Sequence, residues 1–261
     1  MDTAKIMSTP HTAEQIGALW MTYHTAKSQL PTSPSKTYLS ATIPTATYER
    51  LISKVAMYPC FILPLPRRDA LEESIPDVTD NSNSSTTTTP HEFYFAQWGM
   101  HGSPPTPSPS SDGLPPLFNQ INQPSSSSPS SPNSPNPPCT TVLFTSLQEY
   151  KLRQDYATPY LILTHYTDFA QSHGLVLFRG ELTPFTPTST SLSPSPSGGR
   201  STLLSPDDAQ RLALLLQQFY LPPRENDDDD KRGAARAKLL QRFHEEPEAF
   251  RWEDVVDSII L

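Results

Sequence analysis

The chain has 261 residues, a formal net charge of -8 and 30 prolines, and 35% of its residues are hydrophobic. This length allows one or two domains, and the clustered prolines and low hydrophobic share indicate a folded core that disordered insertions dilute. The acidic balance excludes a general nucleic-acid binder, and no apolar run of about 18 residues predicts a membrane span. Two cysteines, Cys60 and Cys139, are too few for a secreted disulfide framework and lack the spacing of a zinc site.

Two helices are predicted near the N-terminus. The first covers residues 12–27 and begins with a capping box, in which Thr12 and Gln15 each cover a backbone N–H of the first turn. The second covers residues 45–57, after a polar connector at residues 31–37. Apolar residues at helical spacing define one face of each helix: Ile16, Leu19, Trp20 and Tyr23 on the first, and Tyr48, Leu51, Ile52 and Val55 on the second.

Five strands are predicted in the central part of the sequence. The segment "CFILPLPRR" is predicted to lie at a sheet edge, because Pro64 and Pro66 cannot donate to a strand ladder. Residues of "EFYFAQW" alternate between two faces, and both faces carry aromatic rings. The remaining strands cover residues 140–147, 158–166 and 173–182, and the second of these is almost wholly apolar, which places it centrally.

Helices are predicted to separate and follow these strands. The segment "QEYKLRQDYA" predicts a helix of two to three turns, and "TDFAQS" a helical turn. In "SPDDAQRLALLLQQFYL", Ser205 is the expected N-cap and Pro206 the first helical residue, with an apolar face formed by Leu212, Leu215, Leu216 and Phe219. Two short helices are predicted at residues 234–243 and 251–260.

The pattern predicts an α+β fold, in which a mixed, mostly antiparallel sheet is flanked by helices. We expect a single domain over residues 11–261 and a flexible N-terminus at residues 1–10. Long Ser/Pro-rich or charged insertions are expected to be disordered, at about residues 70–90, 101–138, 183–202 and 222–232. The insertion at 101–138 is then interpreted as a very long hairpin loop, since the entropic cost of closing a loop rises only slowly with its length.

No assembled catalytic motif is present in the sequence, which lacks the common phosphate-binding, nucleophile-elbow and zinc-protease patterns. A small enzyme that uses His165 with Cys60 or Cys139 remains an alternative; small buried or loop cysteines and a satisfied strand-end histidine explain the same residues. The aspartate run at residues 227–230 lacks the alternating ligand spacing of a calcium loop and indicates a solvated linker.

Three further features suggest binding of another protein. The tract "PNSPNPP" contains a PxxP motif, so a Pro-rich adaptor is a second alternative, although no Arg or Lys lies within residues 69–150 to orient such a ligand. In "PLPRR", Arg67 is either a docking point for an acidic partner or a solvated side chain at a rigid edge. In "FYFAQW", Tyr94 and Trp98 are either core residues or, if no helix covers them, an exposed aromatic patch for a partner.

Several segments together resemble the mitochondrial F(1)-ATPase assembly factor 1 family, the chaperones of the ATP synthase β subunit. These are "ALWMTYH", "IPTATYERLISKVAMYPCFILPLPR", "FYFAQW", the run from "PCTTVLFTSLQEYK" to "LTHYTDFAQSHGLVLFRGEL", "LLSPDDAQRLALLLQQFY" and "RFHEEPEAFRWEDVVDSI". They match in order and spacing over nearly all of the residues expected to be ordered. Their amino-acid sequences are typical of a fungal member.

The resemblance implies a non-enzymatic chaperone of the mitochondrial matrix, with no cofactor, small-molecule substrate, nucleic acid or membrane span. It implies that the protein binds the free β subunit, prevents its aggregation and hands it to the α subunit. The sequence begins without a recognisable presequence, so it is either a mature form or starts inside the coding sequence. The Ser/Pro insertions are longer than the family leads us to expect.

The residues predicted to contact the β subunit are Arg67, Tyr94, Phe95 and Trp98. They are chosen for their chemistry, because arginine and large aromatic side chains dominate binding energy at protein interfaces. The resemblance itself does not supply them.

Overall fold

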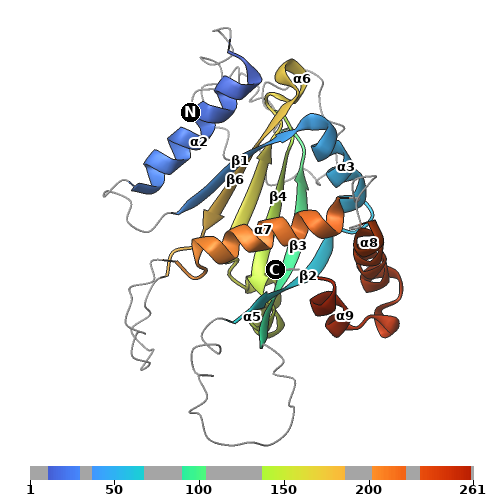
Figure 1. Ribbon diagram of the computed structural model, residues 1–261. Helices are drawn as coiled ribbons and strands as arrows, with labels where there is room; N and C mark the ends of the chain where they lie inside the picture. Colours follow the sequence, from blue (N-terminus) through green and yellow to red (C-terminus); the bar gives the residue numbers. More distant parts are fainter. Residues whose placement is uncertain are drawn as a thin grey trace, which may run out of the picture.

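The computed structural model describes residues 11–29, 37–67, 90–103, 137–185, 202–221 and 230–259, the first two of the last range by their backbone only. Six strands in these ranges form one sheet in the order β1-β6-β5-β4-β3-β2 (Figure 1). Their bounds are β1 Tyr38–Pro44, β2 Cys60–Pro66, β3 His91–His101, β4 Cys139–Ser146, β5 Leu161–Tyr166 and β6 Leu175–Leu182. All five pairings are antiparallel, so the predicted α+β fold is confirmed, as are the edge position of β2 and the central position of β5.

Helices lie before, between and after the strands. Their bounds are α2 Ala13–Gln29, α3 Thr45–Val55, α5 Leu147–Arg153, α6 Ala170–His173, α7 Pro206–Tyr220, α8 Asp230–Glu245 and α9 Trp252–Asp257, with 3-10 turns η2 Gln154–Tyr156 and η3 Pro247–Ala249. The capping box of α2 is confirmed in both directions, with N···O distances of 3.0 and 3.3 Å. Ser205 caps α7 as predicted, by accepting a hydrogen bond from the Asp208 N–H.

Strand β1 is the element that the sequence analysis missed. Its sequence, "YLSATIP", has two small polar residues and ends in proline, so it carries a weak strand signal. It pairs along its whole length with β6, from Tyr38 opposite Glu181 to Pro44 opposite Leu175. Only this long-range pairing identifies the segment as a strand.

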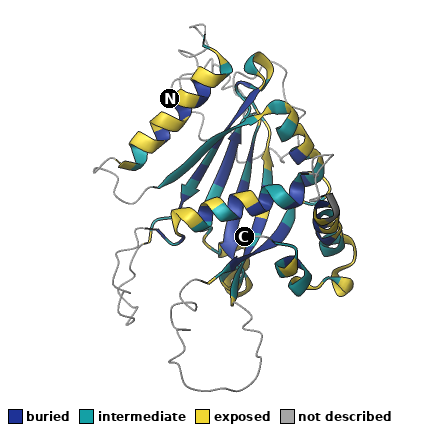
Figure 2. Ribbon diagram, in the orientation of Figure 1, coloured by how far each residue is buried: buried dark blue, intermediate teal, exposed yellow. Residues whose placement is uncertain are grey.

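The main core lies between α7 and one face of the sheet. The four apolar residues predicted for the inner face of α7 are all buried there. Figure 2 shows that buried and exposed residues alternate along the helix. Facing them are Tyr94, Ala96 and Trp98 of β3, which alternate with side chains that point to the opposite face. Helix α7 therefore decides which half of the aromatic strand is core.

A second, smaller core lies under α2 on the opposite face. Ile16 and Trp20 pack there against Phe169, Leu175 and Leu177, and the Trp20 indole N–H donates to the Phe178 carbonyl at 2.8 Å. The predicted apolar face of this helix was partly wrong. Leu19 and Tyr23 are exposed, because the helix turns His24 and Gly17 toward the sheet instead.

The expected insertions lie largely outside the described residues, as does the N-terminus at 1–10. Three boundaries need correction. Strand β3 ends at His101, inside the tract predicted at 101–138. Pro184 and Thr202 form a β-bridge inside the range predicted at 183–202. Helix α8 begins at Asp230, inside the linker predicted at 222–232. Strands β3 and β4 remain paired up to His101 opposite Cys139, so their register does not depend on the tract.

Replacing residues 103–136 by a short Gly-Ser linker is expected to change the free energy of unfolding by less than about 1 kcal/mol, because closure entropy varies only logarithmically with loop length. Urea unfolding followed by tryptophan fluorescence measures this change. Loss of the cooperative transition would show that the tract contributes to the fold.

Two buried histidines make folding sensitive to acid. Burial lowers the pKa of His24 to about 4, and the positive charges of Arg179 and Lys27 act in the same direction. Burial likewise lowers the pKa of His165 to about 4. In the unfolded chain both rings titrate near pH 6.5. As the pH falls, the two histidines therefore bind protons at a higher pH in the unfolded state than in the folded state.

We expect the free energy of unfolding to fall as the pH drops from 6.5 toward 4, by up to about 3 kcal/mol for each histidine. Urea unfolding across this range should show a shallower pH dependence for His24→Phe and His165→Phe than for the unmodified chain. The matched control, His101→Phe, replaces an exposed ring and should keep the full dependence. Equal slopes in all four proteins would contradict the assignment.

Candidate partner-binding surface

The turn formed by α5 and η2 presents the two most exposed large apolar side chains of the described residues. Leu152 is 78% exposed and Tyr156 is 88% exposed. Apolar side chains that lie open to water and form a contiguous patch are typical of binding sites for other proteins. No helix or strand covers them in the described part of the chain, so they are available to a partner.

The backbone between these two side chains is strained. Gln154 has φ 49° and ψ -118°, and it is the only non-glycine residue with a positive φ in the described ranges. A side chain with a Cβ atom disfavours this region, at a cost of about 1–3 kcal/mol. The turn separates α5 from η2 and thereby sets the positions of Leu152 and Tyr156.

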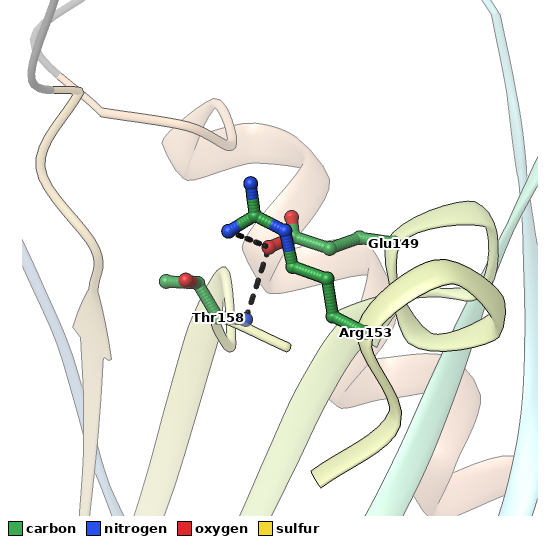
Figure 3. A network of polar contacts seen from close by, with 3 residues as sticks. All are labelled: Glu149, Arg153 and Thr158. Carbon is green, nitrogen blue, oxygen red and sulfur yellow. Dashed lines mark hydrogen bonds and ion pairs between the residues drawn. The ribbon is translucent and has the colours of Figure 1, made fainter. Parts of the chain in front are cut away.

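A polar network holds the turn in this conformation (Figure 3). The Glu149 carboxylate accepts a hydrogen bond from the Thr158 N–H at 3.1 Å, and the same oxygen lies 3.8 Å from the Arg153 guanidinium. The ion pair is partly exposed and contributes little stability by itself. The hydrogen bond between Glu149 and Thr158 has the larger geometric effect, because it ties α5 to the chain segment that enters β5 and so closes the turn.

Aromatic pairs form the base of this region on the sheet. The Phe95 ring lies 4.4 Å from the Tyr150 ring of α5, and the Phe93 ring meets Trp252 of α9 edge-on at 5.5 Å. Both phenylalanines are half-buried, and Trp252 is exposed. The side chains therefore anchor α5 and also contribute to the accessible surface.

Two cationic side chains and the Glu92 carboxylate border a hollow of about 290 Å³ beside α5. Arg67 reaches it from the end of β2 and Lys151 from α5, with Phe93 between the two elements. Arg67 is exposed, and its backbone N–H donates to the Pro90 carbonyl at 2.8 Å, which fixes the start of its side chain. We call the region of α5, η2, Arg67, Phe93 and Phe95 the α5 surface.

The structure separates the four residues predicted to contact a partner. Arg67 and Phe95 lie on the α5 surface. Tyr94 and Trp98 are only 3% and 7% exposed and lie on the opposite face under α7, so in this fold they cannot form the exposed patch considered above. The reason is the strand alternation, which places even and odd residues of β3 on different faces.

Leu152 and Tyr156 were missed by the sequence analysis. They are separated by four residues in a predicted helix, and that spacing is typical of a buried stripe rather than of an exposed one. The helix in fact breaks after Arg153, which removes the basis of the pattern. A single sequence therefore offered no signal that distinguishes these residues from core residues.

The structure also places the residues of the enzymatic alternative. His165 is buried, stacks on Trp98 at 5.7 Å, and its Nδ1 lies 3.2 Å from the Thr140 hydroxyl. The side-chain hydrogen bond of His165 is with the Thr140 hydroxyl and not with Cys60 or Cys139. Within the described ranges, no group of three or more His, Cys, Asp or Glu residues could hold a metal ion.

A search of the described helices for membrane spans found none with the length and apolar character required.

A family model described as "ATP11 protein" matches residues 1–256. The chain belongs to the ATP11 protein family. This match confirms the resemblance to the F(1)-ATPase assembly factors. A curated relative, "Protein atp11, mitochondrial" of Schizosaccharomyces pombe (strain 972 / ATCC 24843), is 30% identical over 146 residues. That match covers 56% of this chain but only 32% of the relative, about a third of its length. The relative is a mitochondrial protein, in agreement with a mitochondrial location for this ATP11-family chain.

Gln154→Gly is expected to raise the free energy of unfolding by about 1 kcal/mol, because glycine adopts a positive φ without the steric cost of a Cβ atom. The matched control, Gln148→Gly, lies within α5 and should lower it by about the same amount. Urea unfolding measures both. A loss of stability in Gln154→Gly would show that the turn is not strained.

Proposed function

We propose that this chain is a mitochondrial assembly chaperone that binds the free β subunit of the F(1)-ATPase, keeps it from aggregating and releases it to the α subunit. Membership of the ATP11 family supports the assembly role. The structural observation that carries the proposal is the exposure of Leu152 and Tyr156 on a strained, tethered turn.

The chemistry of the α5 surface fits an interface core with a charged rim. Leu152 and Tyr156 supply apolar area, and Tyr is one of the residues that contribute most at interfaces. Arg67 and Lys151 beside them favour a partner surface that is acidic at its rim. Because the turn is already held by Glu149, little conformational freedom is lost when a partner binds.

Release requires a difference in affinity and no chemistry. In this proposal the chaperone occupies an apolar part of the β subunit that the α subunit later covers. The α subunit displaces the chaperone because its own interface with β is larger. Nucleotide hydrolysis by the chaperone itself is not needed, and we therefore propose a non-enzymatic role in the matrix.

The structure alters which residues we propose as contacts. Arg67 and Phe95 stay in the proposal as contacts on the α5 surface, joined by Leu152 and Tyr156. Tyr94 and Trp98 enter it as core residues that hold β3 against α7. The adaptor alternative concerns the Pro-rich tract, which lies outside the described residues, and it predicts that the isolated tract binds an SH3-type domain.

Purified chain mixed with isolated β subunit is expected to form a complex of one copy of each, whereas a mixture with α should form none. Size-exclusion chromatography with light scattering measures the mass of both. Leu152→Asp and Tyr156→Ala should each weaken the complex about tenfold or more, because both remove apolar contact area from the centre of the interface.

The matched control is Leu19→Asp, the same change at an exposed leucine of α2, which lies away from the α5 surface. It should leave the complex intact. A complex with α alone would contradict the proposed partner, and full binding by both α5-surface variants would contradict the proposed contact region.

A further inference from the structure

A second hollow lies on the other face of the sheet, between β1, α3 and α7. Its volume is about 610 Å³, and none of the described residues that line it is Asp, Glu, Lys or Arg. Leu39, Ala41 and Ile43 of β1 form one wall, and Leu214 and Leu221 at the flank of α7 form another. In a chain with a net charge of -8, an uncharged wall of this extent favours an uncharged, apolar occupant. We call this hollow the β1–α7 groove.

Strand β1 borders the groove and is an edge strand of the sheet. The Leu182 N–H donates to the Thr37 carbonyl and the Thr45 N–H to the Gly174 carbonyl. These bonds at both ends show that odd-numbered residues of β1 bond to β6, so the backbone groups of Ser40 and Thr42 point outward. Ser40 and Thr42 also line the groove.

Among the described residues, the part of this edge without a hydrogen-bond partner is short and has a defined end on each side. The outward N–H of Tyr38 is already bonded to the Ser28 hydroxyl of α2, at 3.2 Å. Pro44 has no N–H at all. Between them the N–H and C=O groups of Ser40 and Thr42 offer two donors and two acceptors. Natural proteins usually block exposed strand edges because such edges pair with other chains. Here only Tyr38 and Pro44 are blocked, and the unpaired backbone groups between them lie beside an apolar groove.

Several polar but uncharged side chains also line the groove, among them Gln210, Gln217 and His165. The His165 ring borders the groove. The Thr140 hydroxyl lies within hydrogen-bond distance of its Nδ1 and is also 3.3 Å from the Tyr48 hydroxyl. The ring therefore adds a polar group to a mostly apolar groove, where it can face a backbone amide of a bound peptide.

We propose that the β1–α7 groove binds an extended, uncharged apolar segment of the F(1) subunit that this chain holds, added as a short strand beside β1. Main-chain hydrogen bonds to Ser40 and Thr42 hold the segment, and alternate side chains enter the groove against Leu39, Ala41 and Ile43. The proposal rests on the proposed function. A second copy of the chain fits less well, because two copies with a charge of -8 repel each other.

The test uses the full chain and a set of overlapping peptides that span the β subunit, with binding measured by fluorescence polarisation. Apolar, uncharged peptides should bind, and Leu214→Arg should weaken them about tenfold by placing a charge in the groove. Thr42→Pro, which removes one outward donor, should weaken them too. Leu19→Arg is the matched control, since Leu19 is 45% exposed and Leu214 50%, but Leu19 lies outside the groove.

A measurement on the unmodified chain removes the dependence on variants that fail to fold. Hydrogen exchange of single amides, followed by NMR, should show new protection of the Ser40 and Thr42 N–H groups when a binding peptide is added. Self-association that Leu214→Arg abolishes would assign the groove to a second copy and overturn the proposal.

The outcomes separate this inference from the proposed function. A complex with intact β subunit, but no peptide binding and unchanged exchange at Ser40 and Thr42, overturns the groove proposal and leaves the chaperone role standing. Peptide binding with the expected protection, but no complex with intact β, supports the groove as a peptide site and overturns the proposed function.

Discussion

Side chains along a strand alternate between the two faces of a sheet, and in β3 this alternation determines what the protein can present to a partner. Once Tyr94, Ala96 and Trp98 lie against α7, Phe93 and Phe95 must lie on the opposite face. On that face the short helix α5 lies over Phe95, and Trp252 of α9 contacts Phe93. The aromatic strand therefore serves as core on one side and as the base of an accessible surface on the other.

Among the described residues, both faces of the sheet are incompletely covered, and in different ways. On one face, α7 crosses the strands (Figure 1). Beside it an apolar groove lies along β1. On the other, α2 covers β1 and β6 while α5 leaves its own apolar side chains in water. A chain that only had to be stable would gain by closing both. The incomplete coverage is consistent with a protein that holds another polypeptide.

Strain and order occur together at the α5 surface. The backbone at Gln154 is held in an unfavourable region by contacts from Glu149 to Arg153 and Thr158. Such strain persists only where surrounding contacts determine the conformation. The exposed side chains on this turn are thus presented in a fixed arrangement, which reduces the entropy lost on binding.

Sequence patterns by themselves determined the elements whose signals are local: the capped start of α2, the capped and amphipathic α7, the prolines that put β2 at the edge, and the family. They could not identify β1, because seven weakly apolar residues become a strand only by pairing with β6, more than 130 residues away. Nor could they assign the faces of β3 or the exposure of Leu152 and Tyr156. Alternation and helical spacing state which residues share a face, but only the packing of α7, α2 and α5 decides which face is covered.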